Sequence, residues 1–222
     1  MVYFKMKTTK ALVAYDIEKA GALIDKHPVV SVGFFVGDLK GNELETFRIN
    51  FRVQWPVSKE NGLDYRDFEP ECWDSFWSKL DNNIKDQCLV DVHDFKTGWT
   101  KVKKWLVDLE SKYESIDFLT DNPSFDTACV DYALEKYCNS KPMRYSSTNK
   151  YRDVIDVDSM FLMVIPHKKK NYIKQSVREK VIIDHNPVND AHHIYLMYIK
   201  TLECKVDTEE TFHESVKLFS YY

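Results

Sequence analysis

Two acidic residues follow an apolar run near the N-terminus, and their spacing suits a metal site. The apolar segment 12–15 is followed by Asp16 and Glu18, with Ile17 between them. In a β-strand, residues two apart point to the same face, so the two carboxylates would stand side by side. Two like charges beside an apolar strand repel each other and lose solvation. Mg²⁺ or Mn²⁺ would neutralise them, whereas a solvated strand edge would need no cation.

Two further acids and one histidine occupy positions from which side chains are commonly delivered to a site. Asp126 falls in the first turn of a helix predicted over about 125–137, directly after a strand predicted over 115–121. Strand–helix junctions of this kind often carry functional groups in α/β proteins. Asp190 falls on the inner face of a helix predicted over about 187–204, and His185 lies in the loop before it. Taken singly, these are also ordinary features of a first turn and a solvated loop.

The elements that must position these residues follow from the hydrophobic pattern. Segment 29–38 is rich in β-branched and aromatic residues, and segment 45–53 alternates apolar with polar residues. Both predict strands that continue from the first one in an antiparallel meander. Periodicity also predicts a helix over about 70–80 and another over 97–113. Towards the C-terminus the sequence predicts a short strand or strand–helix junction over 151–156, a helix over 157–165 and a basic turn at 167–170. Segment 175–183 is ambiguous, and a last helix is predicted over 209–218.

Length and composition are those of a single globular domain. The 222 residues are 44% hydrophobic and 30% charged, and no stretch approaches 18 consecutive apolar residues, so no membrane span is expected. The N-terminal residues include lysines but no apolar leader region, and the five cysteines form no C-x-x-C pair. We therefore expect reduced cysteines and an intracellular, cytoplasmic protein, with a nuclear or host-cell compartment as the alternative.

The charge is distributed unevenly along the chain. The formal net charge is −4, but residues 141–180 hold ten Lys and Arg against four acids, a local balance of +6. A basic segment on an acidic body is either a footprint for phosphates or a solvated loop with a lysine run.

The ordered acids and histidine resemble the DEDD exonuclease superfamily, which has a ribonuclease H-like fold. The resemblance is strongest to its His-containing branch, DEDDh. The motif Asp-x-Glu is matched by Asp16-Ile17-Glu18, Asn-x-x-x-Asp by Asn122 to Asp126, and His-x-x-x-x-Asp by His185 to Asp190. The Tyr-containing branch would need tyrosine at position 186, where this chain has asparagine. The resemblance covers about residues 11–203 of a single domain 1–222, with a C-terminal helical tail over 207–222.

The resemblance implies an α/β fold with a central mixed five-stranded sheet, the first three strands antiparallel, flanked by helices. It also implies a 3′-5′ exonuclease that uses two Mg²⁺ or Mn²⁺ to release nucleoside 5′-monophosphates from single-stranded RNA or DNA 3′ ends. Asp16, Glu18, Asp126 and Asp190 would hold the ions, and His185 would be the general base. No membrane partner is implied. The choice between RNA and DNA stays open, as does a homodimer.

Further residues are candidates for substrate contacts within this resemblance. Some neighbour the metal acids, some are aromatic, and some are basic and could follow the phosphate backbone. The candidates are Ile17, Asn122, Phe125, Trp73, Trp77, Arg152, Lys168, Lys169 and Lys170, with Arg144 and Lys150 as further basic positions. For the two tryptophans, a place in the hydrophobic core is the competing interpretation.

Two other functions fit parts of the pattern. A catalytically silent ribonuclease H-like module that binds nucleic acid or protein should lack one or more metal acids, and none is missing here. A zinc hydrolase could use His185, His192 and His193, but no H-E-x-x-H motif or cysteine pair supports a tetrahedral site.

Overall fold

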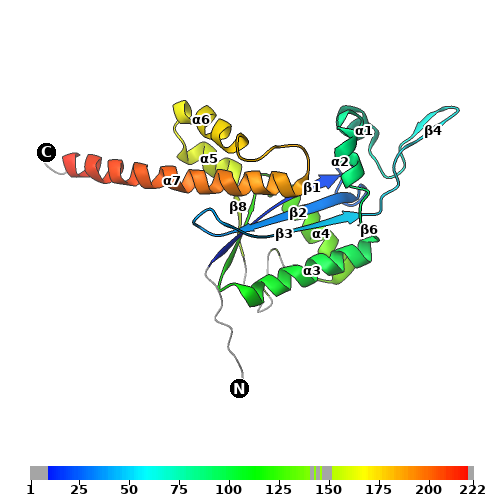
Figure 1. The fold of residues 1–222 in the computed structure, drawn as a ribbon, viewed down its shortest axis with the longest axis horizontal. Coiled ribbons are helices and arrows are strands. Elements are labelled where there is room, and N and C mark those ends of the chain that lie inside the picture. Colours follow the sequence, from blue (N-terminus) through cyan, green and yellow to red (C-terminus); the bar gives the residue numbers. More distant parts are fainter. Residues whose placement is uncertain (1–9, 141–142, 144–145, 147–151, 220–222) are drawn as a thin grey trace, which may run out of the picture.

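A central mixed sheet organises the computed structural model, which describes residues 10–140, 143, 146 and 152–219 (Figure 1). Within these residues its six strands lie in the order β6-β3-β2-β1-β7-β8. They are β1 (Ala11–Lys19), β2 (Val29–Gly37), β3 (Glu43–Phe51), β6 (Val92–His93), β7 (Ile116–Thr120) and β8 (Val154–Asp156). Strands β1 to β3 pair antiparallel, and the pairs β1–β7, β7–β8 and β3–β6 are parallel. Strands β4 (Val57–Lys59) and β5 (Gly62–Asp64) form a separate hairpin.

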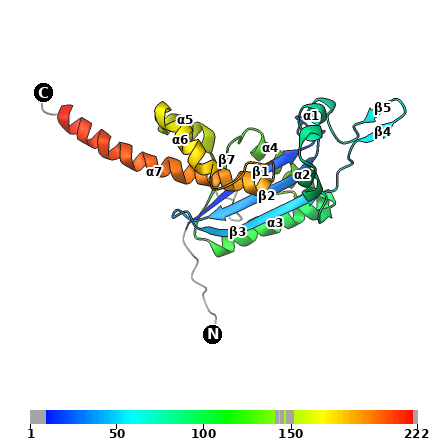
Figure 2. The ribbon, with the colours of Figure 1, turned by 45° about the horizontal axis from the view of Figure 1, so that its top comes forward.

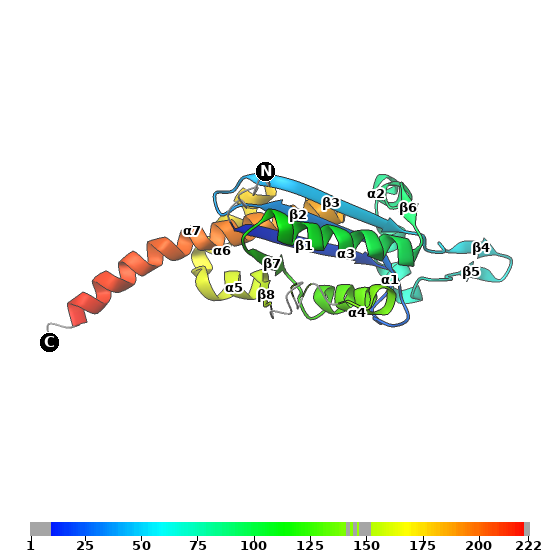
Figure 3. The same cartoon turned by 90° about the horizontal axis from the view of Figure 1, so that it is seen from below.

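Helices cover both faces of this sheet. They are α1 (Pro70–Ser75), α2 (Asn82–Gln87), α3 (Phe95–Lys112), α4 (Asp126–Cys138), α5 (Val157–Val164), α6 (His167–Arg178) and α7 (Pro187–Phe219), with a 3-10 turn η1 at Trp77–Lys79. Helices α3 and α4 lie on one face and α7 on the other, with α5 and α6 packed against α7 (Figures 1 and 3). The C-terminal part of α7 extends well beyond the sheet (Figure 2).

Strand β1 is buried on both faces because it lies between these two helical layers. Its odd-numbered residues from Ala11 to Tyr15 belong to the core shared with α3 and α4. Leu12 and Ala14 belong to the core beneath α7. Since side chains alternate along a strand, the two acids that follow on this register point to the α7 face. The apolar run therefore brings both carboxylates to the edge of a closed core.

The fold confirms the ribonuclease H-like class and the three antiparallel first strands. The predicted five-stranded sheet is wrong by one strand, because the two-residue β6 pairs with β3 at its edge. The predicted last helix over 209–218 is part of a single helix α7, since neither glycine nor proline interrupts the segment after Cys204. The predicted basic turn at 167–170 is the first turn of α6. In the described part of the chain, no helix has an apolar stretch that could cross a membrane.

Candidate active site

The structure gathers the predicted acids and the histidine at the carboxyl end of β1. Asp16 and Glu18 extend from β1 itself, while Asp126 and Asp190 stand in the first turns of α4 and α7. The loop before α7 supplies His185. A cavity of about 330 Å³ lies among these elements, with Asp16, Glu18, His185 and Asp190 in its wall. We call it the metal cavity because these side chains are the candidate metal ligands. Asp16 and Asp190, which are 174 positions apart in the chain, thus meet at one place.

Two groups of possible metal ligands lie next to each other here. In the first, one ligand atom from each of Glu18, His185 and Asp190 lies within 4.8 Å of the others. In the second, carboxylate oxygens of Asp16, Asp121 and Asp126 lie within the same distance of one another. Asp16 and Glu18 are two residues apart on one strand, so the groups share that strand.

Asp121 is a candidate metal ligand that the motif comparison missed. It directly follows β7, which pairs parallel with β1, so the carboxyl ends of both strands meet at the same edge of the sheet. Its place at the end of the strand predicted over 115–121 was the available signal. Phe76 was also missed as a site residue: its ring meets the His185 imidazole edge-on, with centroids 4.8 Å apart.

Burial raises the pKa of all four predicted metal acids. The pKa of Asp16 lies well above its usual value because of burial and the neighbouring charge of Glu18. Burial and Asp190 likewise raise the pKa of Glu18, which the Arg48 guanidinium partly opposes. For Asp126 and Asp190, burial raises the pKa to about 7. Four ionised carboxylates are therefore costly here near neutral pH unless cations neutralise them.

The donor set fits Mg²⁺ or Mn²⁺. Oδ1 of Asp190 is buried and has no hydrogen-bond partner among the described residues, and buried oxygens are otherwise nearly always paired. Oδ2 of Asp126 accepts a 2.6 Å hydrogen bond from the Thr120 hydroxyl, which fixes that carboxylate. Hard carboxylate oxygens dominate both groups, which favours these ions over tetrahedral zinc. His192 belongs to neither described ligand group and instead stacks on Phe35, with centroids 4.1 Å apart.

His185 stands at the mouth of the cavity in a constrained loop. Its side chain is 46% exposed, and Nδ1 lies 3.7 Å from Oε1 of Glu18. Its backbone φ is 62°, in the left-handed region that non-glycine residues rarely occupy. Such strain persists only where the surroundings impose it. The imidazole is therefore held beside the acids while still reachable from solvent.

Asn186 ties this loop to the rest of the fold. Its Oδ1 accepts from the Val188 amide at the start of α7, as an N-cap does. Its Nδ2 donates to Oε1 of Gln87 at 2.8 Å, and the Arg48 guanidinium donates to the same oxygen at 3.2 Å. The asparagine at the position where the Tyr-containing branch would need tyrosine thus anchors the loop to α2 and β3.

The start of α7 also rests directly on the backbone of β2. Gly33 pairs with Asp16 across the two strands. A methyl group at position 33 would overlap the backbone of Pro187 and the amide nitrogen of Val188. The absence of a side chain at Gly33 therefore lets the helix that carries Asp190 approach the strand that carries Asp16.

Three of the predicted substrate residues lie beside the acids. Ile17 and Phe125 line a second cavity of about 520 Å³, which shares Ile17 and Glu18 with the metal cavity and has Phe76 in its wall. The carbonyl of Asn122 accepts from the amides of Phe125 and Asp126, so Asn122 fixes the start of α4. The roles of these residues toward a substrate stay predictions.

The two tryptophans do not line either cavity. Trp77 is fully buried and its indole donates to the Lys19 carbonyl at 2.9 Å. A side chain without exposed surface cannot stack on a base, so the predicted substrate contact of Trp77 is wrong. Trp73 is half-buried and packs edge-on against Trp55 and Phe68. The core interpretation therefore describes this helix better.

The predicted basic residues lie away from the metal cavity. Arg152 forms an ion pair with Glu110 of α3, and its guanidinium lies 5.6 Å from the Phe118 ring centroid. The first turn of α6 carries Lys168, Lys169 and Lys170. None of these four lines the cavity around the acids, and their substrate contacts stay predictions. Arg144 and Lys150 lie outside the described residues.

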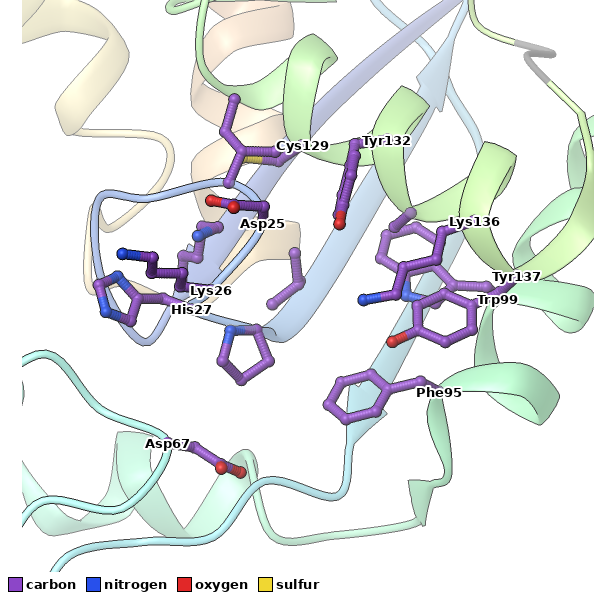
Figure 4. Close-up of a pocket in the computed structure, with 15 residues that line it drawn as sticks. Asp25, Lys26, His27, Asp67, Phe95, Trp99, Cys129, Tyr132, Lys136 and Tyr137 are labelled. Atoms are coloured by element: carbon purple, nitrogen blue, oxygen red, sulfur yellow. The ribbon is translucent and has the colours of Figure 1, made fainter.

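A separate cavity of about 200 Å³ lies between the loop after β1 and helices α3 and α4 (Figure 4). Tyr132, Lys136 and Tyr137 project into it from α4, opposite Asp25 and Lys26 of the loop. Neither the four predicted metal acids nor His185 are among the residues that line this cavity. It is therefore distinct from the candidate active site.

Comparisons with known proteins agree with this geometry. A family model described as "3′-5′ exoribonuclease Rv2179c-like domain" matches residues 11–201. No curated protein matches the chain by sequence.

Several solved nucleases share the fold. E. coli exonuclease I in complex with a dT13 oligonucleotide superposes with a TM-score of 0.58 at 9% identity, over 95% of this chain and 45% of that one. The nuclease domain of 3′hExo, a DEDDh family member bound to rAMP, superposes with a TM-score of 0.53 at 13% identity, over 88% of this chain and 93% of that one. S. pombe Pop2p, in an Mg²⁺ and Mn²⁺ bound form, superposes with a TM-score of 0.53 at 15% identity, over 85% of this chain and 81% of that one. The chain spans less than half the length of the exonuclease I chain.

The raised pKa values predict how stability depends on pH without metal. Between the usual pKa of an aspartate and about 7, Asp190 stays protonated only in the folded state, so the free energy of unfolding falls as pH rises through this window. Urea unfolding of the metal-free protein should therefore show a decrease from pH 5 to 8. Asp190→Asn should remove part of it, on the order of a few kcal/mol. The exposed Asp108→Asn should retain the full decrease. A slope unchanged by Asp190→Asn would contradict the assignment.

The close approach at Gly33 predicts a coupling between packing and metal binding. Gly33→Ala should displace the start of α7, lower stability by about 1–3 kcal/mol and weaken Mn²⁺ binding, because Asp190 moves away from Asp16. Gly98→Ala is the matched control. A methyl group there would lie 2.6 Å from the Phe51 ring, in the layer that contains α3, so stability should fall while Mn²⁺ affinity is retained. Calorimetry and urea unfolding measure both quantities, and equal Mn²⁺ affinities in the two variants would refute the coupling.

Proposed function

The chain belongs to the family described as the 3′-5′ exoribonuclease Rv2179c-like domain, and we propose that it is a DEDDh-type exonuclease that uses two metal ions. The observation that carries this proposal is the pair of adjacent ligand groups at the end of β1. The substrate is a single-stranded 3′ end, and the family description favours RNA over DNA. The products are nucleoside 5′-monophosphates.

The acids and the histidine divide the work between them. Asp16, Asp126 and Asp121 would hold one ion, and Glu18 with Asp190 the other. When bound, two such cations lower the pKa of the attacking water and stabilise the negative charge on the departing 3′ oxygen. Histidine is the side chain that changes charge near neutral pH, so it suits the role of proton acceptor.

The proton path follows from the orientation of the imidazole. Nδ1 of His185 faces Glu18, which leaves Nε2 to accept one proton from the water that attacks the terminal phosphorus. The bond between phosphorus and the 3′ oxygen of the penultimate nucleotide breaks. The shortened strand keeps a 3′ hydroxyl after its oxygen takes up a proton, and His185 returns its proton to solvent.

The second cavity supports a place for the terminal nucleotide. Its wall combines the apolar side chains of Ile17, Phe76 and Phe125 with the carboxylate of Glu18. A base could pack against the apolar part while its phosphate reaches the acids, which would position the scissile bond.

A digestion time course tests this function. Single strands of RNA and DNA, labelled at the 5′ end, are incubated with Mn²⁺, Mg²⁺, Zn²⁺ or EDTA. The expected result is a ladder that shortens from the 3′ end with Mn²⁺ or Mg²⁺. Asp16→Asn should abolish this cleavage, because one carboxylate of the Asp16–Asp121–Asp126 group is lost. His185→Gln should reduce the cleavage rate by about 10²- to 10⁴-fold.

Asp108 is an exposed residue on α3, and the Asp108→Asn variant serves as the control. This variant should cleave RNA and DNA at the wild-type rate. Strand binding without cleavage by the wild type would instead support the catalytically silent module. Cleavage that needs Zn²⁺ and not Mg²⁺ or Mn²⁺ would support the zinc hydrolase.

A further inference from the structure

The metal cavity opens towards a surface that the proposed chemistry does not use. Beside the acids, its wall contains Ile183 and His193. Ile183 is 42% exposed and its neighbour Ile182 is 71% exposed, although both are large apolar side chains. Nδ1 of His193 is buried and has no hydrogen-bond partner among the described residues. The wall of the cavity therefore includes a partly exposed apolar side chain and a buried nitrogen that has no partner among the described residues.

Positive charge lies close to His193. His193 lies near Arg178 and Lys174, whose positive charges, after burial, help to lower its pKa to about 4. Both cations belong to α6, which carries five Lys and Arg and no acid over residues 167–178. The loop after α6 passes beside α7 and leads to the first residues of α7 (Figure 1). The start of α7 lies at the end of the sheet where β1 ends. The last turn of α6 is thus the end that connects to the site, and its lysine-rich first turn is the far end.

Large exposed side chains accompany these charges. Tyr172, in the middle of α6, is 76% exposed. Met163 and Leu162 at the end of the preceding helix α5 are 86% and 54% exposed. Aromatic and cationic groups in alternation are the chemistry that binds single-stranded nucleic acid, through base stacking and phosphate contacts.

We propose that α6 and segment 179–183 bind the unpaired nucleotides upstream of the 3′ end, with Tyr172 as a stacking platform and Arg178 as the phosphate contact nearest the cavity. This inference rests on the proposed function, because it needs a strand whose end lies at the acids. The 12 residues of α6 span about 18 Å, which accommodates a few extended nucleotides. The predicted contacts of Lys168, Lys169 and Lys170 then belong to the far end of this path.

The charge of α6 selects this occupant. The five cations of α6 complement a phosphate backbone. Segment 179–183, which carries Glu179 and Lys180, reaches the cavity wall at Ile183. Stacking on Tyr172 requires bases that are not paired, so a duplex would not use this platform.

Binding and cleavage of strands of two lengths test the proposal. Oligoribonucleotides of 2 and 12 nucleotides are compared by fluorescence anisotropy in an Asp16→Asn background, which prevents cleavage. Tyr172→Ala should weaken binding of the 12-mer by about 5- to 100-fold, with a much smaller effect on the dinucleotide, which is too short to reach α6. Arg178→Gln should reduce the salt slope for the 12-mer by roughly 0.7. Lys104→Gln, an exposed lysine on α3, should leave both affinities unchanged.

The outcomes separate this proposal from the proposed function. Equal losses for both lengths, or no loss with Tyr172→Ala, would overturn the upstream path. A change in self-association with Tyr172→Ala, and none in strand binding, would assign the surface to a second copy of the chain and also overturn it. Length-dependent binding by a wild type that hydrolyses neither strand would uphold the path but refute the nuclease.

Discussion

The repulsion among carboxylates packed together at the end of β1 is the constraint on which the rest of the site depends. Burial and mutual charge raise the pKa values of Asp16 and Glu18, and burial raises those of Asp126 and Asp190 to about 7. A fold that keeps such groups together loses stability in their ionised state. Divalent cations reverse this balance, which gives the arrangement a chemical purpose.

Positioning the acids then becomes a matter of rigid packing. The apolar register of β1 places two of them, the turn after β7 places Asp126, and α7 places Asp190. The least obvious contribution is that of Gly33, which has no catalytic group but lets α7 start against β2. The contact between Asn186 and Gln87 holds the His185 loop from the other side. Sites held by backbone packing and side-chain hydrogen bonds keep the geometry that catalysis needs.

Local patterns predicted much of this from sequence, because the central strands and the three motifs depend on residues close together in the chain. The contributions that escaped prediction depend on tertiary contacts. Asp121 joins the site only because β7 lies parallel to β1, and β6 is too short to show a period. The sequence allowed Trp77 as a base-stacking residue, yet its hydrogen bond to the Lys19 carbonyl holds the indole in the core. The single helix α7 replaces two predicted helices because polar composition alone does not end a helix.

The central claim is that two ions sit side by side in the two ligand groups. Electron paramagnetic resonance of the protein loaded with two equivalents of Mn²⁺ tests it most directly. Ions about 3.5–4 Å apart interact magnetically, so the account predicts the spectrum of a coupled pair. The coupled signal should be lost in Asp16→Asn, which removes one of the three carboxylates of the Asp16–Asp121–Asp126 group. A wild-type spectrum of isolated Mn²⁺ ions at full loading would contradict the account.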